Sequence, residues 1–247
     1  MSSVEGAWPL KRRPALPMLI AGIVGLGLCA LGAFFGPAAF FRSYLVAYLF
    51  WLAFPLGSLA LLMVFNMTGG RWGLGLQAIQ EAAIDTIPLM ALLFVPVALG
   101  LDDLYLWTNS YVLEHDAILR GKSPYLNVPA FLLRAAVYFA VWIVVSQLLN
   151  LWSTNRRRVY DPVIARRGQV FSGPGLAVLG LTLTFAAIDW IMSLEPHWYS
   201  SIFGALIAVA QFLPAFAFGI VMLVWLLGTP AGAEDSMQAE GRRASPG

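Results

Sequence analysis

Six long apolar runs constrain this chain more than any other feature of its sequence. They cover roughly residues 16–36, 43–67, 82–101, 129–151, 173–193 and 200–227. Each run can cross the ~30 Å hydrocarbon layer of a bilayer as a helix, which takes ~20 residues. Since unpaired backbone groups are costly in lipid, such segments fold as helices. The sequence therefore predicts an all-α, polytopic transmembrane helical bundle with six spans, over residues 16–227.

The composition agrees with a chain that sits in lipid. Hydrophobic residues make up 60% of the sequence and charged residues 11%, whereas soluble domains carry about 25% charged residues. Such a chain has too little polar surface to cover itself in water. The first run is too long for a signal peptide, shows no clear cleavage site and is followed by a second span, so we expect it to be retained.

The positive charges predict the orientation of the bundle. Of the 15 Lys and Arg residues, eleven fall on one side of the predicted spans: Lys11, Arg12, Arg13, Arg71, Arg156, Arg157, Arg158, Arg166, Arg167, Arg242 and Arg243. Six crossings place both termini on that side, and the positive-inside rule makes it cytoplasmic. We expect cytoplasmic tails at 1–15 and 228–247, the second one disordered. The net charge of +2 reflects this topology and predicts no nucleic-acid partner.

The cysteine and histidine content argues against a redox centre within the chain. Cys29 is the single cysteine, so it forms no internal disulfide and cannot hold an iron–sulfur cluster alone. His115 and His197 fall in predicted loops, where a bis-histidine haem between helices is not expected. The loop 102–128 is acidic, but its spacing matches no metal-ligand motif. We expect no metal there and favour a polar docking surface for a periplasmic partner.

The stretch FAAIDWIMSLEPHWYS (185–200) places Asp189, Glu195 and His197 where the fifth span ends. Because a short turn leads into the sixth span, we expect these groups to cluster near the outer surface. Arg134 lies at a similar depth in the fourth span and is the expected partner of Asp189. Carboxylates in membrane segments are costly and indicate function. Two interpretations stay open: a structural ion pair, or a proton-accepting site.

A second pair of acids, Glu81 and Asp85, begins the third predicted span at an i, i+4 spacing that puts both on one helix face. One interpretation is that they complement the helix macrodipole at its N-terminus. The other is a cytoplasmic mouth for protons, paired with an outer mouth at Asp189. Such a route needs polar groups between its ends, for which the candidates are Ser58, Tyr138, Gln147, Thr182, Thr184 and Gln211.

Aromatic residues gather at the ends of the predicted spans. They are Trp8, Tyr44, Trp72, Tyr105, Trp107, Trp152, Trp198 and Tyr199. Trp and Tyr favour the membrane–water interface, because their rings are apolar and their tips polar. We therefore expect these residues to form interfacial belts.

Four segments, in this order, resemble one membrane-protein family. They are SYLVAYLFWLAFPLGSLALLMVFNMTGGRWG (43–73), EAAIDTIPLMALLFVPVALGLDDLYLW (81–107), KSPYLNVPAFLLRAAVYFAVW (122–142) and SGPGLAVLGLTLTFAAIDWIMSLEPHWYSSIFG (172–204). They look like the second large membrane subunit of alternative complex III, a quinol:cytochrome c oxidoreductase, in the polysulfide-reductase membrane-subunit superfamily. Members usually have about ten spans of ~20 residues each, and the resemblance covers about six of them.

The resemblance implies a cofactor-free subunit of a respiratory complex in the bacterial inner membrane. In that family the complex oxidises quinol and passes electrons to periplasmic iron–sulfur and haem c subunits. Its polar intramembrane residues are discussed as a proton route, and the matching positions here are Glu81, Arg134, Asp189, Glu195 and His197. Quinol is then an expected ligand, and the chain is an assembly and quinone-facing subunit, not an enzyme alone.

Two other functions remain open from the residues themselves. The first is a small proton-coupled transporter or channel that uses Asp189 and Glu81 as coupling groups. Transporters often contain inverted repeats with broken helices at matching positions, and no matched pair stands out in this sequence. The second is an inactive, shortened relative that serves as a membrane scaffold.

Overall fold

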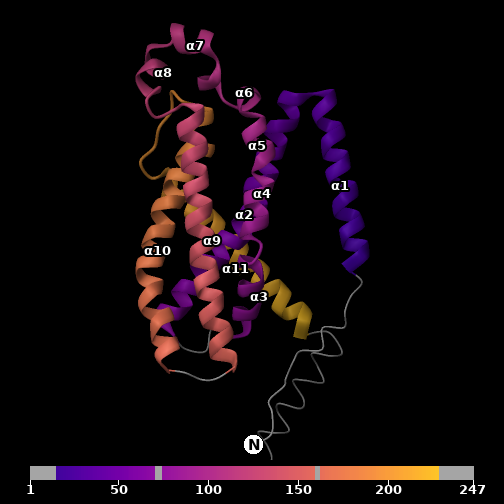
Figure 1. Ribbon diagram of the computed structural model, residues 1–247, viewed down its shortest axis with the longest axis vertical. Helices are drawn as coiled ribbons and strands as arrows, with labels where there is room; N and C mark the ends of the chain where they lie inside the picture. Colours follow the sequence, from indigo (N-terminus) through magenta and orange to yellow (C-terminus); the bar gives the residue numbers. More distant parts are fainter. Residues whose placement is uncertain (1–14, 70–73, 159–161, 228–247) are drawn as a thin grey trace, which may run out of the picture.

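The computed structural model describes residues 15–69, 74–158 and 162–227. Within them the helices, drawn in Figure 1, are α1 Ala15–Phe35, α2 Pro37–Thr68, α3 Leu74–Ile84, α4 Ile87–Leu93, α5 Val95–Leu99, α6 Leu101–Leu104, η1 Leu106–Thr108, α7 Ser110–His115, α8 Ala117–Lys122, α9 Val128–Arg158, α10 Pro162–Trp190, η2 Met192–Leu194 and α11 Phe203–Leu227. These residues contain no strand, which confirms the all-α prediction. Apart from Ala15, the predicted tails lie outside the described ranges.

Among the described residues, five helical segments are long and apolar enough to cross a membrane. They are Pro37–Thr68, Gly75–Leu99, Val128–Trp152, Arg166–Leu194 and Phe203–Leu226. The first predicted run forms α1, a helix of 21 residues. A multi-pass membrane bundle is therefore confirmed, while six crossings and cytoplasmic termini stay predictions.

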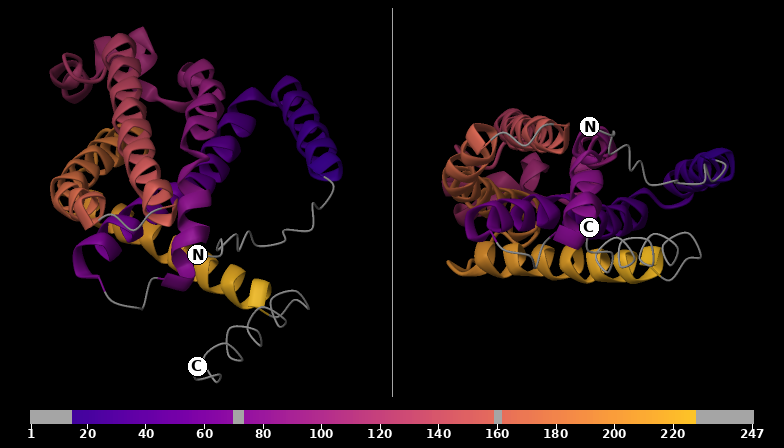
Figure 2. Two further views of the ribbon diagram at one scale, coloured as in Figure 1. Left: turned by 60° about the horizontal axis from the view of Figure 1, so that its bottom comes forward. Right: turned by 90° about the horizontal axis from the view of Figure 1, so that it is seen from below.

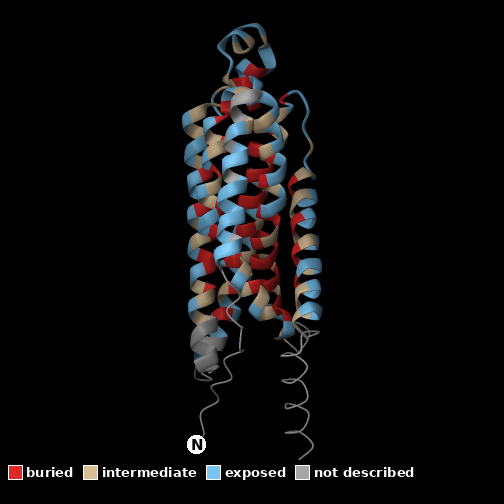
Figure 3. Cartoon of the chain, turned by 90° about the vertical axis from the view of Figure 1, so that its right-hand side faces the viewer, coloured by how far each residue is buried: buried red, intermediate tan, exposed pale blue. Residues whose placement is uncertain are grey.

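Helix α2 is the centre of the bundle. It packs against α1, α3, α4, α5, α6, α10 and α11, and 61% of its most apolar stretch is buried, against 17% for α11. Figure 3 shows buried positions inside the bundle and exposed positions over its outer faces. Since lipid tails are as apolar as leucine, an exposed apolar face is expected on helices that border lipid.

The third span is broken into short helices. Pro88 and Pro96 each occupy the second position of a new helix, α4 and α5. Proline lacks the N–H that would continue the preceding helix, so a fresh helical start after each interruption is expected. By contrast, Pro55, Pro174 and Pro214 lie inside helices that continue past them.

One end of the bundle is covered by the segment 102–127, which we call the cap (Figure 1). Trp107, Leu119 and Leu126 of the cap are buried in the main hydrophobic core. The start of α1 and the end of α11 lie towards the opposite end in Figure 1. Two residues assigned to the interfacial belts, Tyr105 and Trp107, are only 2% and 3% exposed, because the cap folds back onto the core.

Helix α1 stands away from the remaining helices (Figures 1 and 2). Its closest packing is with α2, the next helix in the chain. Leu16, Leu19, Ile23 and Leu28 are all more than half exposed. Helix α1 therefore offers apolar side chains to its surroundings on several faces.

Small residues let α11 lie close to its neighbours. Its buried positions include Gly204, Ala215 and Gly219, which recur at roughly helical spacing. A Cβ atom on Gly57 of α2 would lie 2.2 Å from the backbone oxygen of Gln211 and 2.6 Å from Cβ of Ala215. The backbones of α2 and α11 meet here, as small residues allow at membrane helix interfaces.

Candidate functional site

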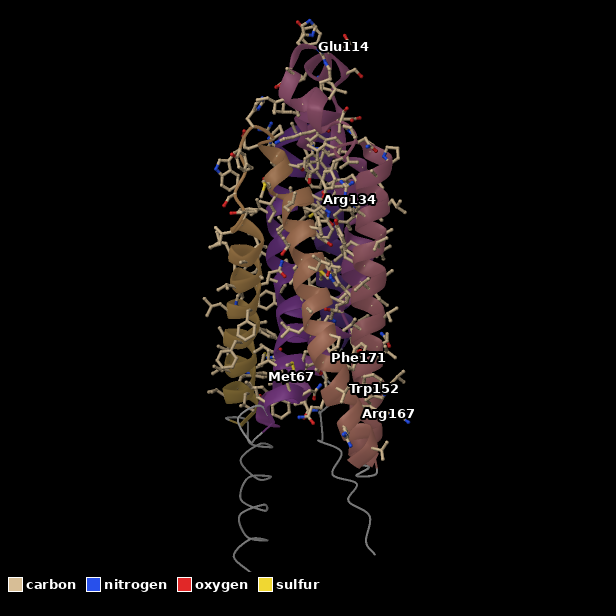
Figure 4. The ribbon with its side chains drawn as sticks, turned by 90° about the vertical axis from the view of Figure 1, so that its left-hand side faces the viewer. Met67, Glu114, Arg134, Trp152, Arg167 and Phe171 are labelled. Carbon is tan, nitrogen blue, oxygen red and sulfur yellow. The ribbon has the colours of Figure 1, made fainter. Side chains whose placement is uncertain are left out.

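Asp189 and Arg134 form a buried ion pair between α10 and α9. Arg134 Nε donates to Asp189 Oδ2 at 2.8 Å, and Nη2 donates to Oδ1 at 3.0 Å. This parallel, two-bond geometry is the strong arrangement for a guanidinium and a carboxylate. The Asp189 side chain is 0% exposed and that of Arg134 is 20% exposed. Figure 4 shows Arg134 within the bundle, on the capped side of its middle.

Two tyrosines complete the hydrogen bonding of the pair. Tyr138 Oη donates to Asp189 Oδ2 at 2.7 Å, and it lies one helical turn after Arg134 on the same face of α9. Arg134 Nη1 donates to the backbone oxygen of Tyr125 at 3.0 Å. The Tyr125 ring lies 3.9 Å from the guanidinium carbon, a cation–π contact. Burial, together with the negative charge of Asp189, raises the pKa of Tyr125 to about 12, so its phenol is neutral.

Aromatic rings surround the pair on the inside of the bundle. Trp190, the residue after Asp189, lies with its ring centroid 4.8 Å from that of Phe94 and 5.7 Å from that of Phe139. Tyr105 Oη of the cap donates to the backbone oxygen of Trp190 at 3.0 Å. In such apolar surroundings charge interactions are stronger than in water. The cap therefore contacts the residue after Asp189 through Tyr105 and the Arg134 guanidinium through Tyr125.

The chemistry open to this arrangement follows from its charges. Asp189 accepts three hydrogen bonds, two from the guanidinium of Arg134 and one from the hydroxyl of Tyr138. Protonating Asp189 would leave the Arg134 charge without its partner, which is costly in a buried place. The Tyr138 hydroxyl, bonded to the carboxylate, is a group through which a proton can arrive or leave. The pair can therefore hold α9 to α10 through two parallel bonds.

Glu195 and His197 belong to different surroundings. His197 Nε2 lies 2.6 Å from Asp116 Oδ2 of the cap, and Glu195 is exposed. Lys122 Nζ donates to the backbone oxygen of Pro196 at 2.5 Å. The expected cluster with Asp189 is thus divided: Asp189 lies inside the bundle, and His197 ties the turn after α10 to the cap.

Asp116 is expected to control how firmly the cap is held. It accepts from the N–H groups of Leu119 and Ile118 at the start of α8, and these bonds together with His197 lower the pKa of Asp116 below its ordinary value of 3.8. Because the folded pKa is lowered, the contribution is present above 3.8 and is lost as pH falls through the lowered value. We expect Asp116→Ala to speed hydrogen exchange of both amides several-fold at neutral pH.

The matched control is Asp116→Asn, which keeps an oxygen that can cap the helix. We expect the Ile118 and Leu119 amides of this variant to exchange about as slowly as in the parent at neutral pH. In the parent their exchange should speed up when Asp116 is protonated in acid, whereas in Asp116→Asn it should not. Equal exchange in Asp116→Ala and the parent would show that the carboxylate does not hold this part of the cap.

Glu81 and Asp85 lie further along their helical segment than the sequence predicts, and Glu81 is half-buried while Asp85 is exposed. Helix α3 starts at Leu74, ahead of the predicted boundary at 82, and its first turn contains no acidic residue. The macrodipole interpretation therefore does not fit. Glu81 Oε1 accepts from Gln77 Nε2 at 2.7 Å, and Asp85, just after α3, accepts from Asn150 Nδ2 of α9. Both acids have polar partners towards the end opposite the cap.

The candidate groups for a polar interior fall into two sets. Ser58, Tyr138, Thr182 and Gln211 are buried, whereas Thr184 is half-buried and Gln147 is exposed. Thr182 Oγ1 accepts from Trp142 Nε1 at 2.9 Å and donates back into its own helix. Because Gln147 is exposed, it does not belong to the buried set of polar side chains.

A small cavity lies beside Trp190, the residue after Asp189. Its walls come from α2, α9, α10 and α11 and include Leu49, Trp142, Trp190 and Gln211. It has room for about one water molecule. A quinone ring does not fit into it.

Sequence reasoning missed three of the partners at these sites. Tyr125 stacks on Arg134, Asn150 binds Asp85, and Asp116 binds His197. The last pair is separated by 81 positions, and no local pattern connects them. Tyr138 had a usable signal, because it lies four residues after Arg134 on one helix.

The described residues show no candidate metal site. Within 15–69, 74–158 and 162–227, no three His, Cys, Asp or Glu side chains gather as metal ligands would. No protein-family model matches this chain, and no curated protein matches its sequence.

Proposed function

We propose that this chain is a membrane subunit of a quinol-oxidising respiratory complex of the alternative complex III type, in a bacterial inner membrane, and that it binds no redox cofactor itself. The observation that carries the proposal is the buried Arg134–Asp189–Tyr138 network. It lies in the segments KSPYLNVPAFLLRAAVYFAVW and DWIMSLEPHW, through which the sequence resembles that family. A fully buried carboxylate in a membrane helix indicates function by default.

The proposed role of the network is to exchange protons near the capped end. Tyr138 is bonded to Asp189 and supplies the contact through which a proton moves. Glu81 and Asp85, with their partners Gln77 and Asn150, supply carboxylates towards the other end. Three further buried polar groups, Ser58, Thr182 and Gln211, lie on α2, α10 and α11.

The partners and the quinol are assigned to surfaces. The cap and the turn after α10 expose Tyr111, Trp198 and Tyr199, and we expect the periplasmic haem c and iron–sulfur subunits to dock there. The cavity beside Trp190 is too small for a quinone ring. A quinol is therefore expected on a lipid-facing surface that this chain shares with another subunit.

A pull-down from native membranes tests the proposal. The tagged chain is isolated in mild detergent, and its eluate is examined by haem absorbance and mass spectrometry. We expect c-type haem and iron–sulfur subunits to co-elute. Elution alone, or with unrelated proteins, would remove the respiratory assignment.

Quinol oxidation by the isolated complex then tests Asp189 directly. We expect Asp189→Asn to lower the rate of quinol oxidation at least tenfold, because the amide cannot take up the proton that the carboxylate would accept. A tenfold change corresponds to a rise of about 1.4 kcal/mol in the activation barrier. Gln147→Leu is the matched control, since Gln147 is exposed on α9, and it should keep the parent rate. An unchanged rate in a stable, assembled Asp189→Asn complex would make the pair purely structural.

A second candidate function is a proton-coupled transporter. The broken third span supports it, because transporter sites often use interrupted helices, and Asp85 lies at the first interruption, between α3 and α4. The purified chain in liposomes would then carry a proton-linked flux that Asp85→Asn abolishes. Neither flux nor co-eluting subunits from a well-folded sample would leave the scaffold function.

A further inference from the structure

Two residues that line the cavity beside Trp190 each carry a buried polar atom without a protein partner. These atoms are the indole Nε1 of Trp190 and the amide Oε1 of Gln211. The two residues are 2% and 7% exposed, and both line the cavity. A buried polar atom without a hydrogen bond is costly, and most such atoms in proteins are paired with protein or ordered water.

The cavity has the size and the chemistry of a site for a single water molecule. Its room matches about one water, and buried waters typically bridge polar groups that lack other partners. An indole N–H donates and an amide oxygen accepts. The remaining walls are apolar and include Leu49, Leu183 and Ile207. They provide no further hydrogen-bonding groups for a larger polar ligand.

We propose that this cavity binds one water molecule, which accepts from Trp190 Nε1 and donates to Gln211 Oε1. The water joins α10 to α11 at a position one residue past Asp189. Since water both donates and accepts, it satisfies the Gln211 amide in either orientation. This hydration site is independent of the respiratory assignment, because it depends only on the cavity and the two polar atoms.

The bridge explains why a polar glutamine lies on the packed face of α11. The neighbouring buried positions of that face are small: Gly204, Ala215 and Gly219. Gln211 carries its backbone oxygen against Gly57 of α2 and its side chain to the cavity. In a lipid bilayer no bulk water is present to form hydrogen bonds with an unpaired amide.

Thermal unfolding in detergent separates a hydrated site from a dry one by the sign of the change. With a water bridge, Gln211→Leu removes an acceptor and should lower the midpoint by roughly 2–4 °C. In a dry cavity the same substitution removes an unpaired polar atom and should raise the midpoint. Gln147→Leu, at an exposed position of α9, is the control for adding a leucine to the membrane domain.

The double variant distinguishes the bridge from simple packing. Trp190→Phe removes the donor but also leaves space among the rings around it. If one water connects the two groups, Gln211→Leu should have little further effect in the Trp190→Phe background. Additive shifts would overturn the proposal.

Raman spectroscopy of the folded protein reports the hydrogen bonding of the Trp190 indole N–H directly, which a change in packing alone would not alter. The indole N–H band in the difference between the parent and Trp190→Phe should have the frequency of a hydrogen-bonded indole. In Gln211→Leu that band should shift towards the unbonded frequency. An unbonded Trp190 in the parent would contradict the proposal, and the parent-minus-Gln211→Leu spectrum serves if Trp190→Phe does not fold.

Discussion

Replacing Asp189 with alanine is expected to lower the free energy of unfolding by about 3 kcal/mol. The substitution leaves the Arg134 charge without its carboxylate and Tyr138 without its acceptor. Breaking a buried pair from one side typically costs 3–5 kcal/mol, and the 20% exposure of Arg134 places the effect at the low end. Chemical or thermal unfolding in detergent micelles measures the change.

The matched variant removes both charges at once. Arg134→Met together with Asp189→Leu fills similar space with apolar atoms, and replacing a whole buried pair is often neutral or stabilising. We expect the double variant to recover most of the stability that Asp189→Ala loses. If it is as unstable as the single variant, the loss comes from packing around α9 and α10 instead of from an uncompensated charge.

Gly57→Ala is expected to reduce the stability of the bundle by about 2 kcal/mol through overpacking. The added methyl group would lie 2.2 Å from the backbone oxygen of Gln211. A backbone atom cannot rotate away as a side chain can, so α2 and α11 must separate. The thermal midpoint should fall by roughly 4–8 °C.

Gly180→Ala provides the control inside another membrane helix. A Cβ atom there meets nothing within 4 Å, and alanine favours a helix over glycine by about 1 kcal/mol. The midpoint of Gly180→Ala should therefore stay level or rise. Equal losses in the two variants would mean that helix propensity or detergent, and not the α2–α11 contact, determines the result.

The helices could be predicted from sequence because length and hydropathy alone determine them. The run 129–151 lies within α9, and 200–227 matches α11 closely. The third span was placed too late in the chain, because Gln77 and Gln80 look like loop residues. Gln80 is in fact buried, and its Nε2 donates to the backbone oxygen of Ala215 at 3.4 Å. Only tertiary packing makes that position favourable.

The contacts of the site could be predicted only where two residues lie at a similar position along neighbouring spans. Arg134 and Asp189 were expected to meet because both lie near the same end of adjacent spans. His197 was placed with Asp189 because the two are close in sequence, yet its partner is Asp116. That pairing depends on how the cap folds over the bundle. Buried Trp107 and Leu119 anchor the cap, and no pattern within the loop shows where they will pack.

The central position of α2 has a consequence for the order in which the protein is made. The ribosome completes α2 well before α10 and α11, the helices that later cover it. Until α11 has been synthesised, the face of α2 around Gly57 lacks the helix that packs against it. A nascent chain that stops before residue 203 lacks α11, so the contact between α2 and α11 forms only after the other described helices have been made.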